Sequence, residues 1–215
     1  MSGCCSPRFY GKVFSEKTAR RDARRYRKKG LKASERDVID FLRGRAETVL
    51  EIGGGVGAIE IELLKGGAVR AMNAELSPSY EDEAKALAAE AGVGDRFAYR
   101  VANIVDEDLE HADAVVMHRV VCCYPDGEGL VRRAADHART HLLITFPREA
   151  PWVRTGFAAF NFAMWALRFE FRAYVHPVDR LLAAADGLHV VHERRGLAWQ
   201  LAVLERDYVD VAVAA

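Results

Sequence analysis

The sequence LEIGGGVG at residues 50–57 places four glycines between an apolar run and the start of a helical pattern. Glycine suits a sharp turn in which the backbone approaches a ligand closely, because any Cβ there would clash. The amide groups at the start of the following helix would point at that ligand. The stretch therefore predicts a strand, a ligand-binding turn and a helix in succession.

Outward from this turn, short apolar runs alternate with helical stretches, which is the pattern of a parallel sheet covered by helices. We expect strands at residues 48–53, 68–76, 97–103, 113–121, 141–146, 188–196 and 199–206. The last two are separated by a turn too short for a crossover helix, so they should pair as a hairpin. The predicted fold is a doubly wound α/β domain, with a mostly parallel Rossmann-like sheet and an antiparallel C-terminal hairpin.

The composition of the whole chain names no partner. Half of the 215 residues are apolar, and 31 basic residues balance 31 acidic ones, as in an ordinary soluble protein with one sizeable core. We find no signal-peptide pattern at the start and no run near the roughly 18 apolar residues that span a bilayer. We expect a cytoplasmic protein, a monomer or a homodimer, without stable membrane association.

The first part of the chain differs in charge from the rest. Residues 8–36 hold twelve basic and three acidic residues, which separates a basic, helical extension at 1–45 from a main domain at 46–215. The extension has three interpretations: a solvated helix, a nucleic-acid contact, or a lid over the ligand. We favour the lid, because only Tyr26 is placed to stack on bases and no N-P-P-Y-type motif follows the fourth strand. We expect no nucleic-acid partner.

Several helix starts are predicted from side chains that can cap them. Ser34 is followed three residues later by Asp37, which has the form of a capping box. The expected N-cap residues are Ser15, Ser34, Ser77 and Asp126.

The glycine pattern fits two cofactors. Gly53, Gly55 and Ala58 satisfy the G-x-G-x-x-A fingerprint of dinucleotide-binding domains, and Glu75 stands where an acid binds ribose hydroxyls. An NAD(P)-dependent oxidoreductase is therefore one interpretation. Glu51 argues against it, because a carboxylate two residues before the first glycine would repel a pyrophosphate but suits a cationic ligand.

Residues 51–57 resemble the E/D-x-G-x-G-x-G motif of class I S-adenosylmethionine-dependent methyltransferases. The resemblance extends over about residues 47–206 and includes the closing hairpin. It implies a transferase that moves a methyl group from S-adenosyl-L-methionine to an oxygen or nitrogen atom of a small molecule. The cofactor-binding residues that it implies are Glu51, Gly53, Gly55, Gly57, Glu75 and Asn103.

Within this resemblance, the glycines would lie beside the methionine part of the cofactor and Glu75 would accept hydrogen bonds from its ribose. The family often has an acidic residue near the end of the third strand that contacts the adenine amino group. This sequence has Asn103 there, and the nearby Asp106 is an alternative for the same contact.

The end of the fourth strand should border the transferred methyl group, because ligands of open α/β sheets lie beyond the carboxyl ends of the strands. His118 is predicted as a general base, and Arg119 or Tyr124 as the residue that orients a polar or anionic substrate. Methyl transfer can also proceed by alignment of the reactants alone, so His118 has a purely structural alternative.

Two pairs of adjacent cysteines, Cys4-Cys5 and Cys122-Cys123, raise a third functional interpretation. Together they could hold a soft metal or metalloid, in thiol-dependent methylation or sensing, although their spacing does not match that of arsenite methyltransferases. Adjacent cysteines bind one ion less easily than a C-x-x-C pair. The alternative is that they are small apolar residues, and no residue is assigned as a metal ligand.

Residues 148–180 form an aromatic-rich insertion after the fifth strand. Its helical part is apolar on nearly every side, which predicts a helix that is buried on both sides or covers a pocket. In the resembled family, insertions here commonly build the substrate cover, which implies an apolar or aromatic small molecule. A membrane-surface helix flanked by Arg154, Arg168 and Arg172 is the alternative.

Overall fold

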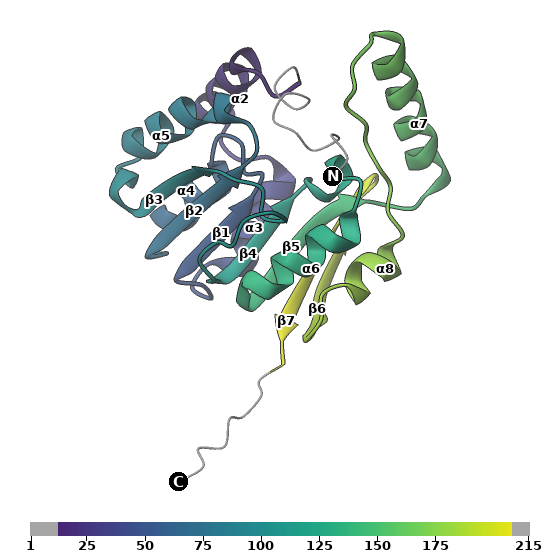
Figure 1. The fold of residues 1–215 in the computed structure, drawn as a ribbon. Coiled ribbons are helices and arrows are strands. Elements are labelled where there is room, and N and C mark those ends of the chain that lie inside the picture. Colours follow the sequence, from purple (N-terminus) through teal and green to yellow (C-terminus); the bar gives the residue numbers. More distant parts are fainter. Residues whose placement is uncertain (1–12, 208–215) are drawn as a thin grey trace.

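Seven strands form one sheet in the computed structural model, which describes residues 13–207 (Figure 1). They are β1 (Thr48–Ile52), β2 (Arg70–Glu75), β3 (Phe97–Val101), β4 (Ala112–His118), β5 (Ala138–Pro147), β6 (Leu188–Arg195) and β7 (Trp199–Arg206). Their order is β3-β2-β1-β4-β5-β7-β6. Strand β7 runs antiparallel to β5 and β6, and the other pairs are parallel. The predicted fold class is confirmed.

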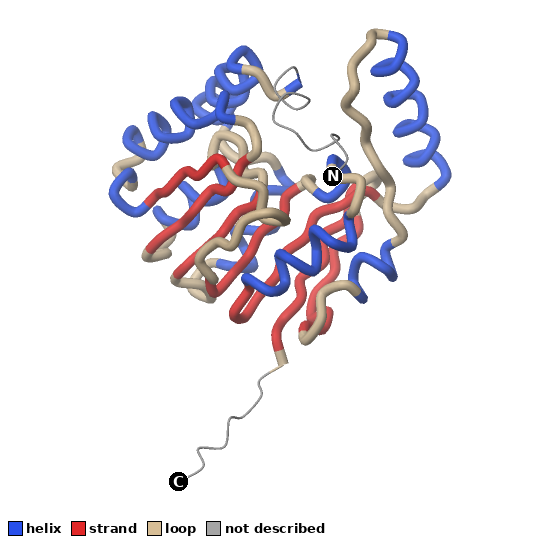
Figure 2. Tube along the Cα trace, viewed as in Figure 1, coloured by secondary structure: helices blue, strands red, loops and turns tan. Residues whose placement is uncertain are grey.

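Helices cover both faces of this sheet (Figure 2). They are α2 (Glu16–Lys29), α3 (Ala33–Leu42), α4 (Ala58–Lys65), α5 (Glu81–Glu90), α6 (Gly127–His137), α7 (Pro151–Ala166) and α8 (Val178–Ala183). Short 3-10 turns are η2 (Pro78–Tyr80), η3 (Gly94–Arg96) and η4 (Val121–Cys123). Within the described chain, every helix is too short or too polar to cross a bilayer.

The side chains of β4 point alternately into two hydrophobic cores, one on each face of the sheet. Val115 and Met117 pack into the core on the side of α6 and α8, whereas Ala114 and Val116 pack into the core on the side of α3, α4 and α5. Successive side chains of a strand point to opposite faces, so a strand covered on both faces is apolar at every position.

The predicted strands match the observed ones apart from their ends. The largest differences are at β5, which begins three residues before the segment expected at 141–146, and at the segment expected at 113–121, where β4 ends at His118. Arg119 has a φ of 61°, which lies in the left-handed region and stops the extended conformation. The chain then turns into η4, so residues 119–124 form a loop at the carboxyl edge of the sheet.

Of the four predicted caps, Asp126 is confirmed, because its carboxylate accepts a hydrogen bond from Gly129 N at 2.8 Å. Ser15 and Ser77 stand at the N-cap positions of α2 and η2, but neither side chain makes a capping bond. The Ser77 hydroxyl donates instead to the carbonyl of Phe14 at 2.8 Å. This bond ties the N-terminal extension to the end of β2.

The capping box predicted at Ser34 and Asp37 is wrong. Helix α3 begins two residues earlier than predicted, with Lys32 as its N-cap, and the Glu35 carboxylate accepts the Lys32 backbone N–H at 2.5 Å. Glu35, at the third helical position, makes the bond to the N-cap N–H that the sequence predicted for Asp37. Ser34 is thereby left free of the capping role and points toward β4, where it contacts His118.

Helix α7 is not buried on both sides, contrary to one sequence expectation. It stands out from the body of the molecule (Figure 1), and within the helix only Val153 is buried. Its exposed large side chains are Trp152, Phe160, Phe162 and Trp165. The insertion nevertheless contacts the extension, because the rings of Phe171 and Phe14 meet edge to face at 5.8 Å.

Candidate cofactor and substrate site

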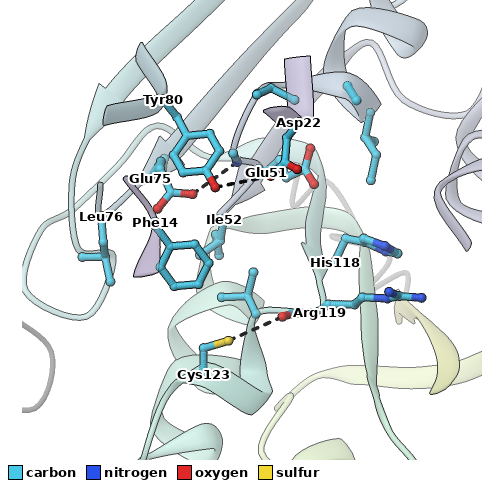
Figure 3. A pocket seen from close by; sticks show the side chains of 18 of the residues that line it. Phe14, Asp22, Glu51, Ile52, Glu75, Leu76, Tyr80, His118, Arg119 and Cys123 are labelled. Atoms are coloured by element: carbon cyan, nitrogen blue, oxygen red, sulfur yellow. Dashed lines mark hydrogen bonds between the residues drawn. The ribbon is translucent and has the colours of Figure 1, made fainter. Parts of the chain in front are cut away.

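A cavity of about 250 Å³ opens at the carboxyl ends of β1 and β4. The strand order reverses between these two strands, and in doubly wound sheets ligands bind at such a switch point. The glycine turn after β1 forms one wall and the loop after β4 forms another (Figure 3). The position of the cavity therefore follows from the topology of the sheet.

The first glycine of the turn is required by its conformation and by its neighbour. Gly53 has a φ of 69°, and its N–H donates to Ala74 O at 2.7 Å. A Cβ at Gly53 would stand 2.6 Å from a methyl group of Val120. The turn and the loop after β4 thus touch at the wall of the cavity, and only glycine permits this approach.

Two polar residues of β2 hold the turn in place. Asn73 is fully buried; its side-chain oxygen accepts Gly54 N–H at 3.1 Å and its amide donates to Gly55 O at 3.1 Å. The Glu75 carboxylate accepts Gly55 N–H at 3.2 Å and Ser77 N–H at 3.1 Å. Burial raises the pKa of Glu75 in spite of these bonds.

A pair of buried carboxyl groups lies beneath the turn. Glu51 and Glu60 are 2 % and 0 % exposed, and Glu60 stands at the third position of α4, close under Gly54. Burial, with the charge of Glu60 and a hydrogen bond between the two carboxyls, raises the pKa of Glu51 well above its usual range. The helix N-terminus favours ionised Glu60, so Glu51 carries the proton when no cation is near.

We expect Glu51→Gln to raise the free energy of unfolding at pH 8 by about 1–3 kcal/mol, because a neutral amide removes the cost of a buried carboxylate. A carboxyl whose pKa is raised in the folded state contributes its full stabilisation to the fold below the unfolded-state pKa of 4.5. This contribution is lost as the pH rises toward the folded-state pKa. Urea unfolding should therefore show that the free energy of unfolding falls less between pH 5 and pH 8 in Glu51→Gln than in the wild type.

The control for this change is Glu47→Gln, at an exposed glutamate just before β1. It should leave the pH dependence of unfolding unchanged. A Glu51→Gln profile parallel to that of the wild type would mean that the carboxyl pair is not protonated in the folded state.

On the opposite side of the cavity, His118 is held between two hydroxyl groups. Its Nε2 lies 3.3 Å from Ser34 Oγ and its Nδ1 lies 3.2 Å from Thr145 Oγ1. Burial and the adjacent Arg119 charge lower the pKa of His118 to about 4. The imidazole is therefore neutral near pH 7 and can accept a hydrogen bond.

Arg119 is fixed by an aromatic ring and a hydroxyl. Its guanidinium carbon lies 4.5 Å from the centre of the Trp199 ring, and Nη2 donates to Ser34 Oγ at 3.2 Å. Its Nε–H is buried without a hydrogen-bond partner among the described residues. A half-buried guanidinium with an unused donor beside a cavity suits an anionic or polar ligand group.

The N-terminal extension supplies part of the cavity wall. The lining side chains that it contributes are Phe14, Asp22, Arg25, Lys32 and Glu35. Two of them, Asp22 and Glu35, are acidic. Together with Glu51 and Glu75 they bring four carboxyl groups to the cavity, and three of these residues, Asp22, Glu51 and Glu75, are labelled in Figure 3. Arg25 and Lys32 pair with Glu35 at 3.6 and 3.3 Å and offset its charge. The other three acids suit a ligand group that carries positive charge.

Helix α2 is anchored more firmly than its thin apolar stripe suggests. Ala19 and Ala23 are fully buried, and the Tyr26 hydroxyl donates to Glu62 at 2.6 Å. Arg27 makes two hydrogen bonds to the Glu90 carboxylate, at 2.7 and 2.8 Å. The helix therefore packs on α4 and α5 through hydrogen bonds between residues that are far apart in the sequence.

The structure brings most of the predicted site residues to one cavity. Those that line it are Glu51, Gly53, Gly55, Glu75, Asn103, His118, Arg119 and Tyr124. Gly57 is different: it is absent from the lining, and a Cβ there would stand 2.9 Å from the Phe97 ring. Its φ of 74° and its place as N-cap of α4 make it a packing residue of the turn.

Asn103 and Asp106 do not act independently. The Asn103 amide donates to the Asp106 carboxylate at 2.7 Å, and Asn103 Oδ1 accepts Val105 N–H at 3.3 Å. Only Asn103 of the two predicted alternatives lines the cavity. Asp106 orients the amide from outside.

Sequence reasoning missed residues that reach the site from a distance. Asn73 gave a signal, since a polar residue inside an apolar strand needs a buried partner. Glu60 gave none, because an acid in the first turn of a helix is ordinary. Phe14, Ser34 and Glu35 come from the extension, and only its docking over the sheet brings Phe14 and Glu35 to the cavity and Ser34 to His118.

Cys122 and Cys123 are the last two residues of η4, and Cys123 lines the cavity. The other pair, Cys4-Cys5, falls outside the described residues. Among residues 13–207, no three His, Cys, Asp or Glu side chains are grouped so as to hold a metal ion.

Comparison with known proteins identifies the fold through structure alone. No protein-family model matches the chain, and no curated protein sequence matches it. The chain is similar in structure to a magnesium protoporphyrin IX methyltransferase from Synechocystis PCC 6803 with bound S-adenosylhomocysteine. That likeness has a TM-score of 0.67 at 19 % identity, over 81 % of this chain and 82 % of the other.

Two further solved structures share the fold. A geranyl diphosphate C-methyltransferase from Streptomyces coelicolor A3(2) matches with a TM-score of 0.63 at 15 % identity, over 82 % of this chain and 78 % of the other. An O-methyltransferase family protein from Burkholderia thailandensis matches with a TM-score of 0.65 at 19 % identity, over 80 % of this chain and 56 % of the other. The chain has the fold of class I methyltransferases.

Proposed function

We propose that this chain transfers a methyl group from S-adenosyl-L-methionine to an oxygen or nitrogen atom of a small, apolar or aromatic molecule. The observation that carries the proposal is the cavity itself, in which a glycine turn at a sheet switch point is combined with buried carboxyl groups. The fold agrees with it, since similar structures include methyltransferases determined with the cofactor product.

The residues present fit this cofactor. Glu75 has both oxygens on backbone N–H groups and keeps lone pairs for ribose hydroxyls. One oxygen of Glu51 is buried without a hydrogen-bond partner, and it would accept from the cofactor's ammonium group. A pyrophosphate would meet repulsion from the same carboxyls, which disfavours an NAD(P) cofactor. The bound cofactor supplies an electrophilic methyl group on a sulfonium.

The substrate would lie on the other side of the cavity, against the loop after β4. Arg119 and Tyr124 would orient its polar group, with Arg119 offering its unused Nε–H. The 148–180 insertion would cover the substrate with its exposed aromatic side chains. The contact of Phe171 with Phe14 would link this cover to the 1–45 extension, which we propose to act as the lid.

The cofactor test is calorimetry of the full chain with S-adenosylhomocysteine and, separately, with NADH. We expect micromolar binding of the first and no measurable binding of the second. Binding of NADH alone would contradict the proposal and favour an oxidoreductase. Screening metabolite extracts with an isotopically labelled methyl donor would then identify the acceptor.

His118→Ala is expected to lower turnover about 100-fold while changing the affinity for S-adenosylhomocysteine less than threefold, because a general base acts on the substrate side. Neutral imidazole is the active form, so wild-type turnover should be independent of this group above pH 6 and fall as pH approaches 4. The exposed His189 serves as the matched control and its alanine variant should keep full turnover. Equal losses of affinity and turnover in His118→Ala would indicate a structural role.

A further inference from the structure

Arg119 is a half-buried cation at the cavity wall that has no ion pair with an acid in the described part of the chain. Its guanidinium donates from Nη2 to Ser34 Oγ at 3.2 Å, and its Nε–H is buried without a partner among the described residues. Burial lowers the pKa of Arg119, because the site does not compensate the lost hydration of the charge. A buried cation is stable when an anion pairs with it.

The acid that acts on Arg119 from a distance is Glu35, and other cations already share its charge. Glu35 lies 3.3 Å from Lys32 Nζ and 3.6 Å from Arg25 Nη2. Its attraction raises the pKa of Arg119 by less than burial lowers it. Glu35 therefore does not serve as the counterion of Arg119.

The main chain holds Arg119 in a conformation that glycine adopts more easily. Its φ of 61° lies in the left-handed region, which is unfavourable for a residue with a Cβ. Its N–H donates to Thr145 O at 3.1 Å, and its carbonyl oxygen contacts the sulfur atoms of Cys122 and Cys123 at 3.4 and 3.8 Å (Figure 3). Strained residues of this kind cluster at sites where the direction of the side chain has a function.

An aromatic ring fixes the plane of the guanidinium. The guanidinium carbon lies 4.5 Å from the centre of the Trp199 ring, and Phe157 of α7 meets this ring at 6.3 Å. A stacked guanidinium directs its N–H groups sideways, so Nε–H and one N–H of Nη2 form a fork that matches a planar carboxylate. In Figure 3, Arg119 and His118 extend in the same direction, away from Glu75. The fork is therefore apart from the proposed ribose site.

The charges of the cavity favour a carboxylate over a phosphate. Asp22, Glu51 and Glu75 line the same cavity, and their negative charges would repel a ligand that carries two negative charges. A carboxylate carries one negative charge, which Arg119 alone can neutralise. Its planar shape also fits the fork of a guanidinium.

We propose that the methyl acceptor is an aromatic carboxylate whose carboxylate group binds Nε–H and Nη2–H of Arg119, with its ring against Phe157 and Trp199. The proposal rests on the proposed function in taking the bound molecule as the methyl acceptor. The carboxylate anchors the molecule, and a different oxygen or nitrogen atom of it receives the methyl group. Arg119 then distinguishes acids from their neutral analogues.

The test is a fluorine NMR titration of the full chain with two probes of the same shape, para-fluorobenzoate and para-fluorobenzamide. We expect the wild type to bind the benzoate about tenfold more tightly than the benzamide, because only the benzoate pairs with Arg119. Arg119→Gln loses the charge and the fork, so its affinities for the two probes should be about equal. Arg119→Lys keeps the charge without the fork and should retain part of the preference.

The control is Arg132→Gln, which removes an exposed arginine of α6 outside the cavity and should leave the preference unchanged. Equal affinity of the wild type for both probes, or no detectable binding of either, would overturn the proposal. A preference for the benzoate that persists in Arg119→Gln would overturn it too.

Calorimetry of the same proteins with S-adenosylhomocysteine separates this proposal from the proposed function. Arg119→Gln should bind S-adenosylhomocysteine as the wild type does, because Arg119 lies on the substrate side. Binding of S-adenosylhomocysteine without a preference for the benzoate contradicts only the carboxylate site. A preference for the benzoate without binding of S-adenosylhomocysteine contradicts the proposed methyl transfer and leaves the carboxylate site in place.

Discussion

Glu75→Ala is expected to weaken the binding of S-adenosylhomocysteine about 100-fold, which corresponds to about 2.7 kcal/mol. Under the proposed function, the carboxylate accepts hydrogen bonds from the ribose hydroxyls, and bonds to a charged acceptor are worth about 1.5–3 kcal/mol each. The substitution also leaves Gly55 N–H and Ser77 N–H without their acceptor. The glycine turn would then lose its connection to the end of β2. Isothermal titration calorimetry measures the change in affinity.

Two further variants separate the loss of ribose contacts from loss of the turn. Glu75→Gln keeps one acceptor oxygen, so it should retain much of the stability while still losing about tenfold in affinity. Glu110→Ala removes an exposed glutamate before β4 and should change neither quantity. Wild-type affinity in Glu75→Ala would mean that the nucleoside does not lie against β2, and the proposed cofactor placement would be wrong.

Gly53→Ala is expected to destabilise the protein by about 3 kcal/mol, the largest loss of stability among the single-atom additions to the turn. A positive φ costs an alanine about 1–2 kcal/mol. The new Cβ would also stand 2.6 Å from a Val120 methyl group, and a β-branched side chain cannot rotate freely away. The rest of the loss comes from this overpacking. Urea unfolding measures it.

Matched variants divide this loss into its two causes. Gly92 has a φ of 70° and open space around it, so Gly92→Ala should show the conformational cost alone, about 1 kcal/mol. Val120→Ala in the Gly53→Ala background removes the close methyl groups and leaves Val120 Cβ at 3.5 Å, an ordinary contact. The double variant should recover about 1–2 kcal/mol. No recovery would show that the backbone conformation alone requires glycine.

Most of the fold could be predicted because it depends on local pattern. Apolar runs separated by helical stretches located all seven strands, and the short turn after β6 required an antiparallel partner. Strand ends were less accurate, as at β4, where a single left-handed residue, Arg119, stops the strand. The periodicity of the sequence does not predict a left-handed residue such as Arg119, because the loop that follows imposes its conformation.

The N-cap of α3 is a second feature that the local sequence did not predict correctly. Ser34 with Asp37 has a preferred N-cap residue, and Lys32 with Glu35 has the glutamate that a capping box uses at its third position. Each pair therefore has half of the pattern, two residues apart. Docking of α3 against the sheet decides between them, because it buries Val38 and Leu42 together. The same docking brings Ser34 to His118 and Glu35 to the cavity.

By itself, the sequence determined the order of strands and helices, the glycine turn with Glu51 and Glu75 on either side of it, and the closing hairpin. These follow from backbone hydrogen bonding and from burial with periods of two and 3.6 residues, which neighbouring residues encode. Only the tertiary structure decided that Glu60 lies beneath the turn beside Glu51, and that the basic extension forms part of the cavity wall. Such contacts join residues far apart in the chain, and packing of whole elements fixes them.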